Sequence, residues 1–264
     1  MCLVTGATGI AAATAHRLAA DGTAAFVTSR TESSCRTLAA QLRDAGGQAA
    51  WHAADLTRDA DADAMVAAAV AAFGRIDGLF SAAGGSGRRF GDGPIHELTP
   101  EGWDRTLELN LRSQALVARA VVRRMLDQDR DALGSRGAIV LLSSVLALQP
   151  VAELFATHAY AAAKGAIVAL GRSMAASYAP AGIRVNVVAP GLTDTAMAAR
   201  AAADPRTVAF ARRKQPLAGG FLAPDDVAGA VAYLLGVGSR AVTGQVLEVD
   251  GGWSVTAAGV EDGS

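Results

Sequence analysis

The sequence has few of the residues that build covalent cross-links or metal centres. Its 264 residues include two cysteines, Cys2 and Cys35, and four histidines scattered along the chain. Neither cysteine has a second cysteine or a histidine at ligand spacing. This excludes a disulfide framework and a zinc site and favours two free thiols in a reducing compartment. We expect no bound metal.

Charge of one sign is also scarce. The 24 Lys and Arg residues and 25 Asp and Glu residues give a formal net charge of −1, and no long block of like charges occurs. Nucleic acids and anionic membranes are bound through clustered positive charge, so we expect neither as a partner. The composition favours a small-molecule partner.

Long uninterrupted hydrophobic runs are missing as well. The most apolar window, residues 137–156, contains Glu153, a proline and several polar residues, which a membrane span would tolerate poorly. The N-terminus has no basic region followed by a long apolar stretch, so it does not resemble a secretory signal. We expect a cytoplasmic protein without a membrane segment.

What the chain does have is 51% hydrophobic residues arranged in a regular alternation. Short apolar runs that are typical of buried strands cover 3–5, 24–28, 76–81, 138–142, 183–188 and 246–249. Stretches of helical period cover 31–45, 59–73, 101–126, 158–179 and 224–235, with Asp59 and Thr99 as expected N-caps.

This alternation predicts the fold class. Continuous apolar strands suit a parallel sheet that is covered on both faces, so we expect an α/β fold with a doubly wound parallel sheet, the Rossmann fold, in a single domain spanning 1–264. The segments 84–94 and 196–220 are the least regular. In such a fold, irregular loops at strand ends commonly hold the substrate, and we expect these two to act as lids.

The opening stretch VTGATGIA has the pattern of a nucleotide-binding turn. An apolar strand, a glycine-containing turn and a helix place backbone N–H groups where a pyrophosphate is bound. Gly6 would permit the turn and Gly9 would let phosphate approach, with alanine at 11 or 12 where the pattern asks for close helix packing. A tight turn without a ligand is the alternative.

The next strand end bears on the choice of cofactor. An acidic residue about twenty positions after such a turn binds the ribose of NAD, whereas an arginine accommodates the phosphate of NADP. Here the strand ends with Ser29 and Arg30, and no carboxylate occupies this end; Glu32 comes later. Arg30 as an ordinary surface residue is the alternative, but the pattern favours NADP.

The segment HAYAAAKGAIVAL places Tyr160 and Lys164 four residues apart on one face of an expected helix. A free tyrosine has a pKa of about 10, and a nearby ammonium group and helix N-terminus would lower it, which would suit an acid/base catalyst. The chain has three tyrosines and two lysines. The spacing therefore arises by chance only about 0.02 times.

The ordered motifs of the chain resemble those of the short-chain dehydrogenase/reductase family, in its shorter single-domain branch. The resemblance covers nearly the whole chain. It comprises TGATGIA at 5–11, ADL at 54–56, SAAG at 81–84, Asn110 in LELNL, LLSSV at 141–145, YAAAK at 160–164, IRVNVVAPGLTDT at 183–195 and TGQVLEVDGG at 243–252.

The resemblance implies a catalytic set of four residues. Tyr160 would be the general acid that protonates the carbonyl, and Lys164 would hold the ribose hydroxyls and lower the pKa of Tyr160. Ser144 would hydrogen-bond the substrate oxygen, and Asn110 would hold a water that links Lys164 to solvent. Singly, a buried serine or asparagine often only satisfies backbone groups.

The resemblance also implies the cofactor contacts. Asp55 and Leu56 would meet the adenine, and the segment 190–195 would bracket the nicotinamide, with Thr195 at its carboxamide. The full expected set is Thr5, Gly6, Thr8, Gly9, Ile10, Ser29, Arg30, Asp55, Leu56, Ala83, Gly84, Tyr160, Lys164, Pro190, Gly191, Thr193 and Thr195.

Two features depart from the family pattern. The opening turn is one residue shorter than TGxxxGxG and is similar to the TGxxGxxG of the extended branch, which includes epimerases and dehydratases. Ser81 stands where the family usually has asparagine. Chain length and the PG and TGQ segments favour the shorter branch.

These observations predict an NADP-dependent oxidoreductase that transfers hydride between nicotinamide and a carbonyl or secondary alcohol, as a homotetramer or dimer. The alternatives are an NAD-preferring alcohol dehydrogenase of the same family and a catalytically silent nucleotide-binding or sensing protein. Apolar residues in the loops 85–97, 146–157 and 196–220 suggest an apolar substrate, namely Leu146, Leu148, Phe155, Met197, Phe210 and Leu217, while Arg88 and Arg89 would suit an acidic group.

Overall fold

A seven-stranded, entirely parallel sheet forms the centre of the protein. The computed structural model describes residues 1–256, and the last eight residues of the expected domain lie outside this range. The strand order is β3-β2-β1-β4-β5-β6-β7, as a doubly wound fold requires. The strands are β1 (Cys2–Thr5), β2 (Ala25–Ser29), β3 (Ala49–Ala53), β4 (Gly78–Ser81), β5 (Gly137–Leu142), β6 (Ile183–Pro190) and β7 (Val246–Val249).

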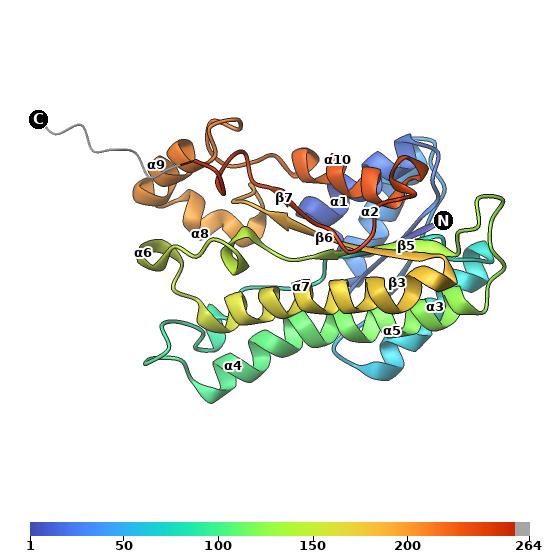
Figure 1. Cartoon of the computed structure of the whole chain (residues 1–264), viewed down its shortest axis with the longest axis horizontal. Helices are drawn as coiled ribbons and strands as arrows, with labels where there is room; N and C mark the ends of the chain where they lie inside the picture. Colours follow the sequence, from blue (N-terminus) through green and yellow to red (C-terminus); the bar gives the residue numbers. More distant parts are fainter. Residues whose placement is uncertain (257–264) are drawn as a thin grey trace, which may run out of the picture.

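Helices cover both faces of this sheet (Figure 1). Side chains alternate along each strand, so Leu3 packs among residues of α3 and α5 while its neighbour Val4 packs among residues of α1 and α10. The helices are α1 (Gly9–Ala20), α2 (Glu32–Asp44), α3 (Asp59–Phe73), α4 (Pro100–Leu107), α5 (Ser113–Leu126), α6 (Ala152–Phe155), α7 (His158–Tyr178), α8 (Ala199–Ala202), α9 (Pro205–Lys214) and α10 (Pro224–Leu235).

The sequence pattern missed the strand β3. Its residues Ala49–Ala53, AAWHA, contain no β-branched residue, and Trp51 is the one residue among them that favours a strand, so the local strand signal is weak. The segment becomes a strand because its backbone pairs in parallel with β2, Trp51 opposite Val27.

The strand expected at 76–81 begins only at Gly78. The backbone N–H and C=O of Ile76 instead form hydrogen bonds with the side chain of Gln128, at 2.7 and 2.9 Å.

The long helix expected at 101–126 is interrupted. α4 and α5 are joined by a π-helical turn, Glu108–Arg112, which carries Asn110. The cap expected at Thr99 is present, since its hydroxyl accepts a hydrogen bond from the N–H of Gly102 at 2.9 Å. The cap expected at Asp59 is wrong: Arg58 is the N-cap of α3, and Asp59 is the first helical residue.

The segment expected to be an irregular lid, 196–220, is partly helical. It contains a short 3₁₀ turn, α8 and α9, and α9 is capped by the carboxylate of Asp204, which accepts from the N–H of Arg206 at 3.1 Å. With α6, these helices lie at the end of the molecule toward which the strands point (Figure 1). The functional side chains described below gather at this end.

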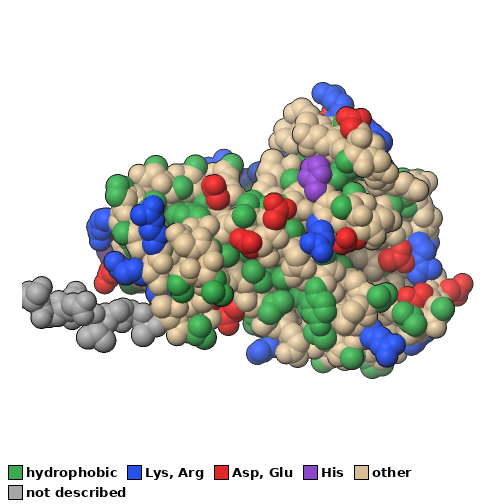
Figure 2. Space-filling view, turned by 90° about the horizontal axis from the view of Figure 1, so that it is seen from above, with side chains coloured by type: hydrophobic (Ala, Val, Ile, Leu, Met, Phe, Trp, Pro, Cys, Tyr) green, Lys and Arg blue, Asp and Glu red, His purple; other side chains and the backbone are tan. Residues whose placement is uncertain are grey.

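The surface carries charges of both signs. Figure 2 shows acidic and basic side chains distributed across the face in view. No helix among residues 1–256 is long and apolar enough to cross a membrane. Within the same residues, His, Cys, Asp and Glu side chains form no cluster that could hold a metal ion.

Candidate active site

Two adjoining cavities lie at the carboxyl edge of the sheet. The larger, about 330 Å³, opens between the turn after β1, the loops after β4, β5 and β6, and the start of α7. The smaller, about 260 Å³, opens beside the ends of β2 and β3. Gly6, Thr8, Ala83 and Gly84 line both cavities, so the two form one elongated site.

The structure brings most of the expected residues to this site. The larger cavity is lined by Gly6, Thr8, Gly9, Ile10, Ala83, Gly84, Asn110, Ser144, Tyr160, Lys164, Pro190, Gly191, Thr193 and Thr195. The smaller cavity adds Ser29, Arg30, Asp55 and Leu56. Thr5 lines neither cavity. It is fully buried, and its hydroxyl accepts hydrogen bonds from the N–H groups of Ala82 and Ala83 at 2.9 and 3.0 Å.

The opening turn fits a dinucleotide pyrophosphate. Thr8 is the N-cap of α1 but its side chain makes no capping bond, and the first turn of the helix holds no acidic residue. The free N–H groups and the positive end of the helix dipole therefore face the cavity, as anion binding requires. Gly9 has a φ of +54°, and a Cβ there would lie 2.9 Å from Cγ2 of Thr195. The shortened turn keeps its cradle open.

Ser81 stands where the family pattern has asparagine, and its side chain makes no hydrogen bond to the other residues that the structure describes. Its hydroxyl is buried and finds no partner among the described residues. The loop after β4 is held instead by Thr5, and by Asn110 further along. The side-chain amide of Asn110 donates to the C=O of Gly85 at 2.9 Å, and its oxygen accepts from the N–H of the same residue at 3.2 Å.

Gly84 sits where only a glycine fits. A Cβ at this position would lie 2.6 Å from Oδ1 of Asn110 and 3.6 Å from Nζ of Lys164. The π-helical turn places Asn110 against this loop, because it lets the side chain point into the site while the flanking helices stay continuous. The expected partners Gly84, Asn110 and Lys164 are thus packed together.

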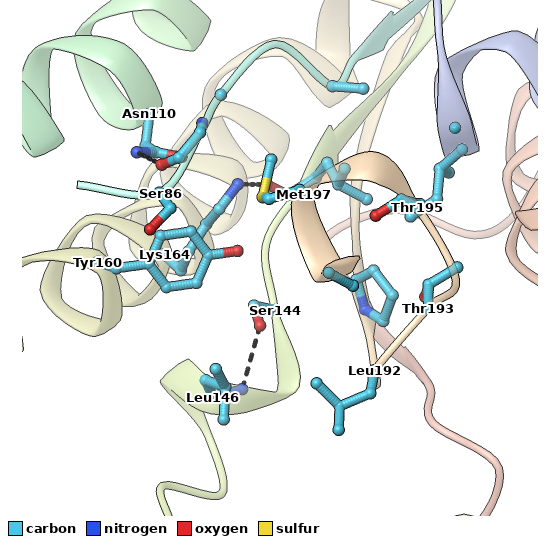
Figure 3. Close-up of a pocket in the computed structure, with 18 of the residues that line it drawn as sticks. Ser86, Asn110, Ser144, Leu146, Tyr160, Lys164, Leu192, Thr193, Thr195 and Met197 are labelled. Atoms are coloured by element: carbon cyan, nitrogen blue, oxygen red, sulfur yellow. Dashed lines mark hydrogen bonds between the residues drawn. The ribbon is translucent and has the colours of Figure 1, made fainter. Parts of the chain in front are cut away.

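Tyr160 and Lys164 lie side by side on the first two turns of α7 (Figure 3). Nζ of Lys164 lies 5.6 Å from the centre of the Tyr160 ring and donates to the C=O of Leu142 at 2.9 Å. Ser143 fixes this helix to the end of β5, because its hydroxyl donates to the C=O of Lys164 at 2.8 Å. Ser144 lies on the same side of the cavity as Tyr160.

The pKa shift of Tyr160 is opposite to the expected one. Desolvation raises the pKa of Tyr160 above its ordinary value, and a hydrogen bond with Ser144 lowers it by less. Lys164 does not offset this, because burial lowers its own pKa to about 7. The lysine is 3% exposed, so its charged form has lost most of its water.

A residue that the sequence analysis missed holds the start of α7. The carboxylate of Asp92 is buried and accepts hydrogen bonds from the N–H groups of Ala159 and Tyr160 at 3.0 and 3.1 Å. Asp92 is therefore a long-range cap for the helix that carries Tyr160. In the sequence it stands between two glycines and has no pattern that separates it from an ordinary turn residue.

A second missed residue holds the loop after β6. Gln215 is fully buried, and its amide oxygen accepts from the N–H of Leu192 at 2.6 Å while its nitrogen donates to the C=O groups of Leu192 and Gly220 at 3.0 and 2.6 Å. A Cβ at Gly191 would collide with this amide. Gln215 thus fixes the course of the segment that carries Thr193 and Thr195.

The smaller cavity has one basic and one acidic side chain, Arg30 and Asp55, in its lining. Burial alone would raise the pKa of Asp55. Hydrogen bonds from the hydroxyl and N–H of Thr57 and the charges of Arg30 and Arg58 together have the larger effect, so the pKa lies below its ordinary value. Asp55 accepts these bonds from Thr57 at 2.8 and 3.2 Å. The Asp55 carboxylate is thus largely used within its own loop, while Arg30 borders the cavity.

Apolar side chains line part of the larger cavity. Of the six expected apolar residues, Leu146, Phe155 and Met197 line it, whereas Leu148, Phe210 and Leu217 do not. Leu217 is 89% exposed. Phe210 packs behind Phe155, with ring centres 6.4 Å apart, and both contact the buried Trp253.

Comparison with known proteins shows the family of the chain. Residues 4–254 match the family described as enoyl-(acyl carrier protein) reductase. Cis-4-hydroxycyclohexanecarboxylate dehydrogenase of Sinomonas cyclohexanicum is 40% identical over 96% of both chains, and short-chain reductase protein NovJ of Streptomyces niveus is 37% identical over 96% of this chain and 93% of its own. An actinorhodin polyketide ketoreductase variant solved with NADPH has a TM-score of 0.84 and 34% identity, covering 96% of this chain and 97% of its own.

The chain belongs to the short-chain dehydrogenase/reductase family. It is accordingly an oxidoreductase that uses a nicotinamide cofactor and acts on CH–OH or C=O groups.

The lowered pKa of Lys164 predicts a pH-dependent stability. The unfolded chain keeps this proton up to the ordinary lysine value of about 10.5, whereas the folded chain releases it at about 7. Between these values the unfolded state binds more protons, so the Lys164 contribution to the free energy of unfolding rises with pH. Urea unfolding should show wild type gaining about 1–3 kcal/mol relative to Lys164→Met from about pH 7 to about pH 9.5.

Lys214→Met controls for the removal of one lysine and should give no comparable rise. A difference between wild type and Lys164→Met that stays constant or shrinks with pH would contradict the assignment.

Proposed function

We propose that this protein is an NADP-dependent oxidoreductase that interconverts a ketone and a secondary alcohol, with Tyr160 as the acid/base catalyst. The proposal rests on one observation. Ser144, Tyr160 and Lys164 line a cavity that extends to the N-terminus of α1. A nicotinamide supplies the hydride donor or acceptor in this chemistry. The chain then has to bind, orient and exchange one proton.

Tyr160 is the side chain suited to the proton transfer. Its hydroxyl and that of Ser144 border the same space, so one substrate oxygen can accept a hydrogen bond from each (Figure 3). The raised pKa of Tyr160 keeps its proton in place until an alkoxide develops on the substrate. Ser144 stabilises the same developing charge.

Lys164 is suited to tune Tyr160 and to hold ribose hydroxyls. With a pKa of about 7, its amine changes protonation state near neutral pH. Binding of polar groups beside Nζ would restore the ammonium form, and the ammonium charge would then lower the pKa of Tyr160. Asn110 supports this arrangement by holding Gly85. A water held near Asn110 as a proton path stays a prediction.

The preference for NADP is supported by the smaller cavity. Ser29 and Arg30 border it at the end of β2, where an acidic residue would select NAD. The one carboxylate in this lining, Asp55, is hydrogen-bonded to Thr57. A ribose phosphate would therefore meet the Arg30 guanidinium, which is suited to bind it.

The names of the relatives support a ketone or secondary alcohol as substrate. One is a dehydrogenase of a hydroxycyclohexanecarboxylate, and one is a polyketide ketoreductase. The apolar lining by Leu146, Phe155 and Met197 suits the carbon skeleton of such a molecule. The single domain, the cytoplasmic location and the homo-oligomeric state stay predictions.

Tyr160→Phe should abolish most turnover and leave nucleotide affinity unchanged. The ring keeps its packing but loses the exchangeable proton, for which we expect a loss of about 10²–10⁴-fold in kcat. The measurement is NADPH oxidation with 4-oxocyclohexanecarboxylate and a panel of neutral ketones, beside a fluorescence titration with NADPH. Tyr178→Phe is the matched control at the other end of α7. Wild-type turnover by Tyr160→Phe would remove this residue from the mechanism.

NADPH should bind at least about tenfold more tightly than NADH, because Arg30 adds one charged contact to the ribose phosphate. The double variant Ser29→Asp, Arg30→Ala should reverse the order, since the new carboxylate repels phosphate and accepts ribose hydroxyls. Fluorescence titration with both nucleotides measures this. Equal affinities in the wild-type protein would favour the NAD-preferring alternative.

Gly9→Val should weaken NADPH binding by about 10-fold or more, because its side chain would fill the phosphate cradle and press on Thr195. Gly22→Val is the matched control: Gly22 also has a positive φ, +78°, but a Cβ there meets nothing within 4 Å. Thermal unfolding of both variants separates backbone strain from lost binding. If both lose affinity equally, the turn is not the phosphate site.

A further inference from the structure

Two arginines from distant segments border the larger cavity. Arg88 lies in the short 3₁₀ turn after β4, and Arg200 lies in α8, which follows β6. Both side chains line the same cavity. Burial lowers the pKa of the Arg88 guanidinium, and the charge of Arg200 lowers it as well. Two like charges therefore converge on one cavity from opposite loops.

Neither guanidinium forms an ion pair with another of the residues that the structure describes. Within residues 1–256, no Asp or Glu oxygen lies within 4.0 Å of Arg88 or Arg200. Asp92 is the carboxylate that acts on Arg88, but both of its oxygens accept hydrogen bonds from the start of α7. Among residues 1–256, therefore, no carboxylate forms a direct ion pair with the two arginines at the cavity.

The neighbouring arginine behaves differently. Arg89 does not line the cavity, and its guanidinium stacks 4.6 Å above the centre of the Phe90 ring. Of the two consecutive arginines, only Arg88 therefore shares the cavity with Arg200. Arg89 provides a matched control for any experiment on Arg88.

The rest of the lining indicates what would meet the two arginines. Ser144 and Tyr160 offer hydroxyls to a carbonyl or alcohol oxygen, while Phe155 and Met197 give an apolar wall. Guanidinium groups bind carboxylates and phosphates through paired, charge-assisted hydrogen bonds. An oxyanion on the substrate would also relieve the repulsion between the two cations.

We propose that Arg88 and Arg200 together bind an oxyanion, a carboxylate or a phosphate, carried by the substrate at a distance from its reacting carbonyl or alcohol. The proposal rests on the function proposed above and adds the substrate class: a ketone or secondary alcohol with an apolar body and an anionic group. Both arginines are specificity determinants that contact the substrate, and neither takes part in proton transfer.

The first experiment compares ketone reduction within acid and amide pairs. The probes are 4-oxocyclohexanecarboxylate, 5-oxohexanoate and 7-oxooctanoate, each beside its primary amide. We expect kcat/KM for at least one acid to exceed that of its amide by about tenfold or more. Arg88→Gln and Arg200→Gln should each erase this preference by raising KM for the acid, with kcat little changed, and Arg89→Gln should retain it.

The second arm distinguishes the source of the oxyanion. Acetoacetyl-phosphopantetheine and acetoacetyl-pantetheine differ by one phosphate group. A preference of about tenfold for the phosphorylated thioester, lost in the Arg88→Gln and Arg200→Gln variants, assigns the site to phosphate. A preference confined to the keto acids assigns it to carboxylate.

Two results would overturn the proposal. One is the absence of any preference in both arms. The other is a loss in Arg88→Gln or Arg200→Gln that affects neutral and anionic substrates equally, or that appears as weaker NADPH binding in a titration. The second result would assign the arginines to folding or to the cofactor.

A binding measurement separates this proposal from the proposed function. Calorimetric titration of cyclohexanecarboxylate, cyclohexanecarboxamide and phosphopantetheine into the protein, with and without NADPH, needs no turnover. If none of the ketones is reduced, the proposed function fails, yet anion binding that is lost in both arginine variants still supports the oxyanion site. If no anion binds in preference to the amide, the site is rejected.

Discussion

The burial of the Lys164 amine is the constraint around which the site is built. Its side chain passes under the loop after β4 and donates to the C=O of Leu142, so the first turns of α7 must lie against the ends of two strands. The cost of burying this amine is visible in its lowered pKa of about 7. That cost keeps Lys164 responsive to whatever polar groups enter the cavity beside it.

The loops around this lysine are held by side chains that bind backbone. Thr5, Asn110 and Gln215 each hydrogen-bond to the main chain of a loop that follows a strand, and Asp92 does the same for the first N–H groups of α7. Because each of these bonds is buried or partly buried, losing one leaves an unsatisfied backbone group. The reacting side chains are therefore fixed by neighbours that do no chemistry themselves.

The local sequence pattern accounts for most of the sheet but not for every element around it. The alternation of apolar runs and helical stretches was enough to predict the parallel sheet, and its six predicted strands are present with small shifts in their ends. β3 escaped because AAWHA has only a weak local strand preference and becomes a strand by pairing with β2. The helix α9 escaped because proline and glycine follow it closely and because a packing partner of its Phe210, Trp253, is distant in sequence. The helix α8 has four residues, too few to show a helical period.

The sequence by itself determined which chemistry-bearing residues are present and how the local elements carry them. Spacing alone puts Tyr160 and Lys164 on one helical face, and a strand followed by a glycine turn exposes N–H groups at Gly9. Tertiary structure decided the direction of the Tyr160 pKa shift, which follows from desolvation by neighbours that the sequence does not reveal. It also decided that Arg88 and Arg200 border one cavity, because only the convergence of loops at one sheet edge brings residues so far apart in the chain together.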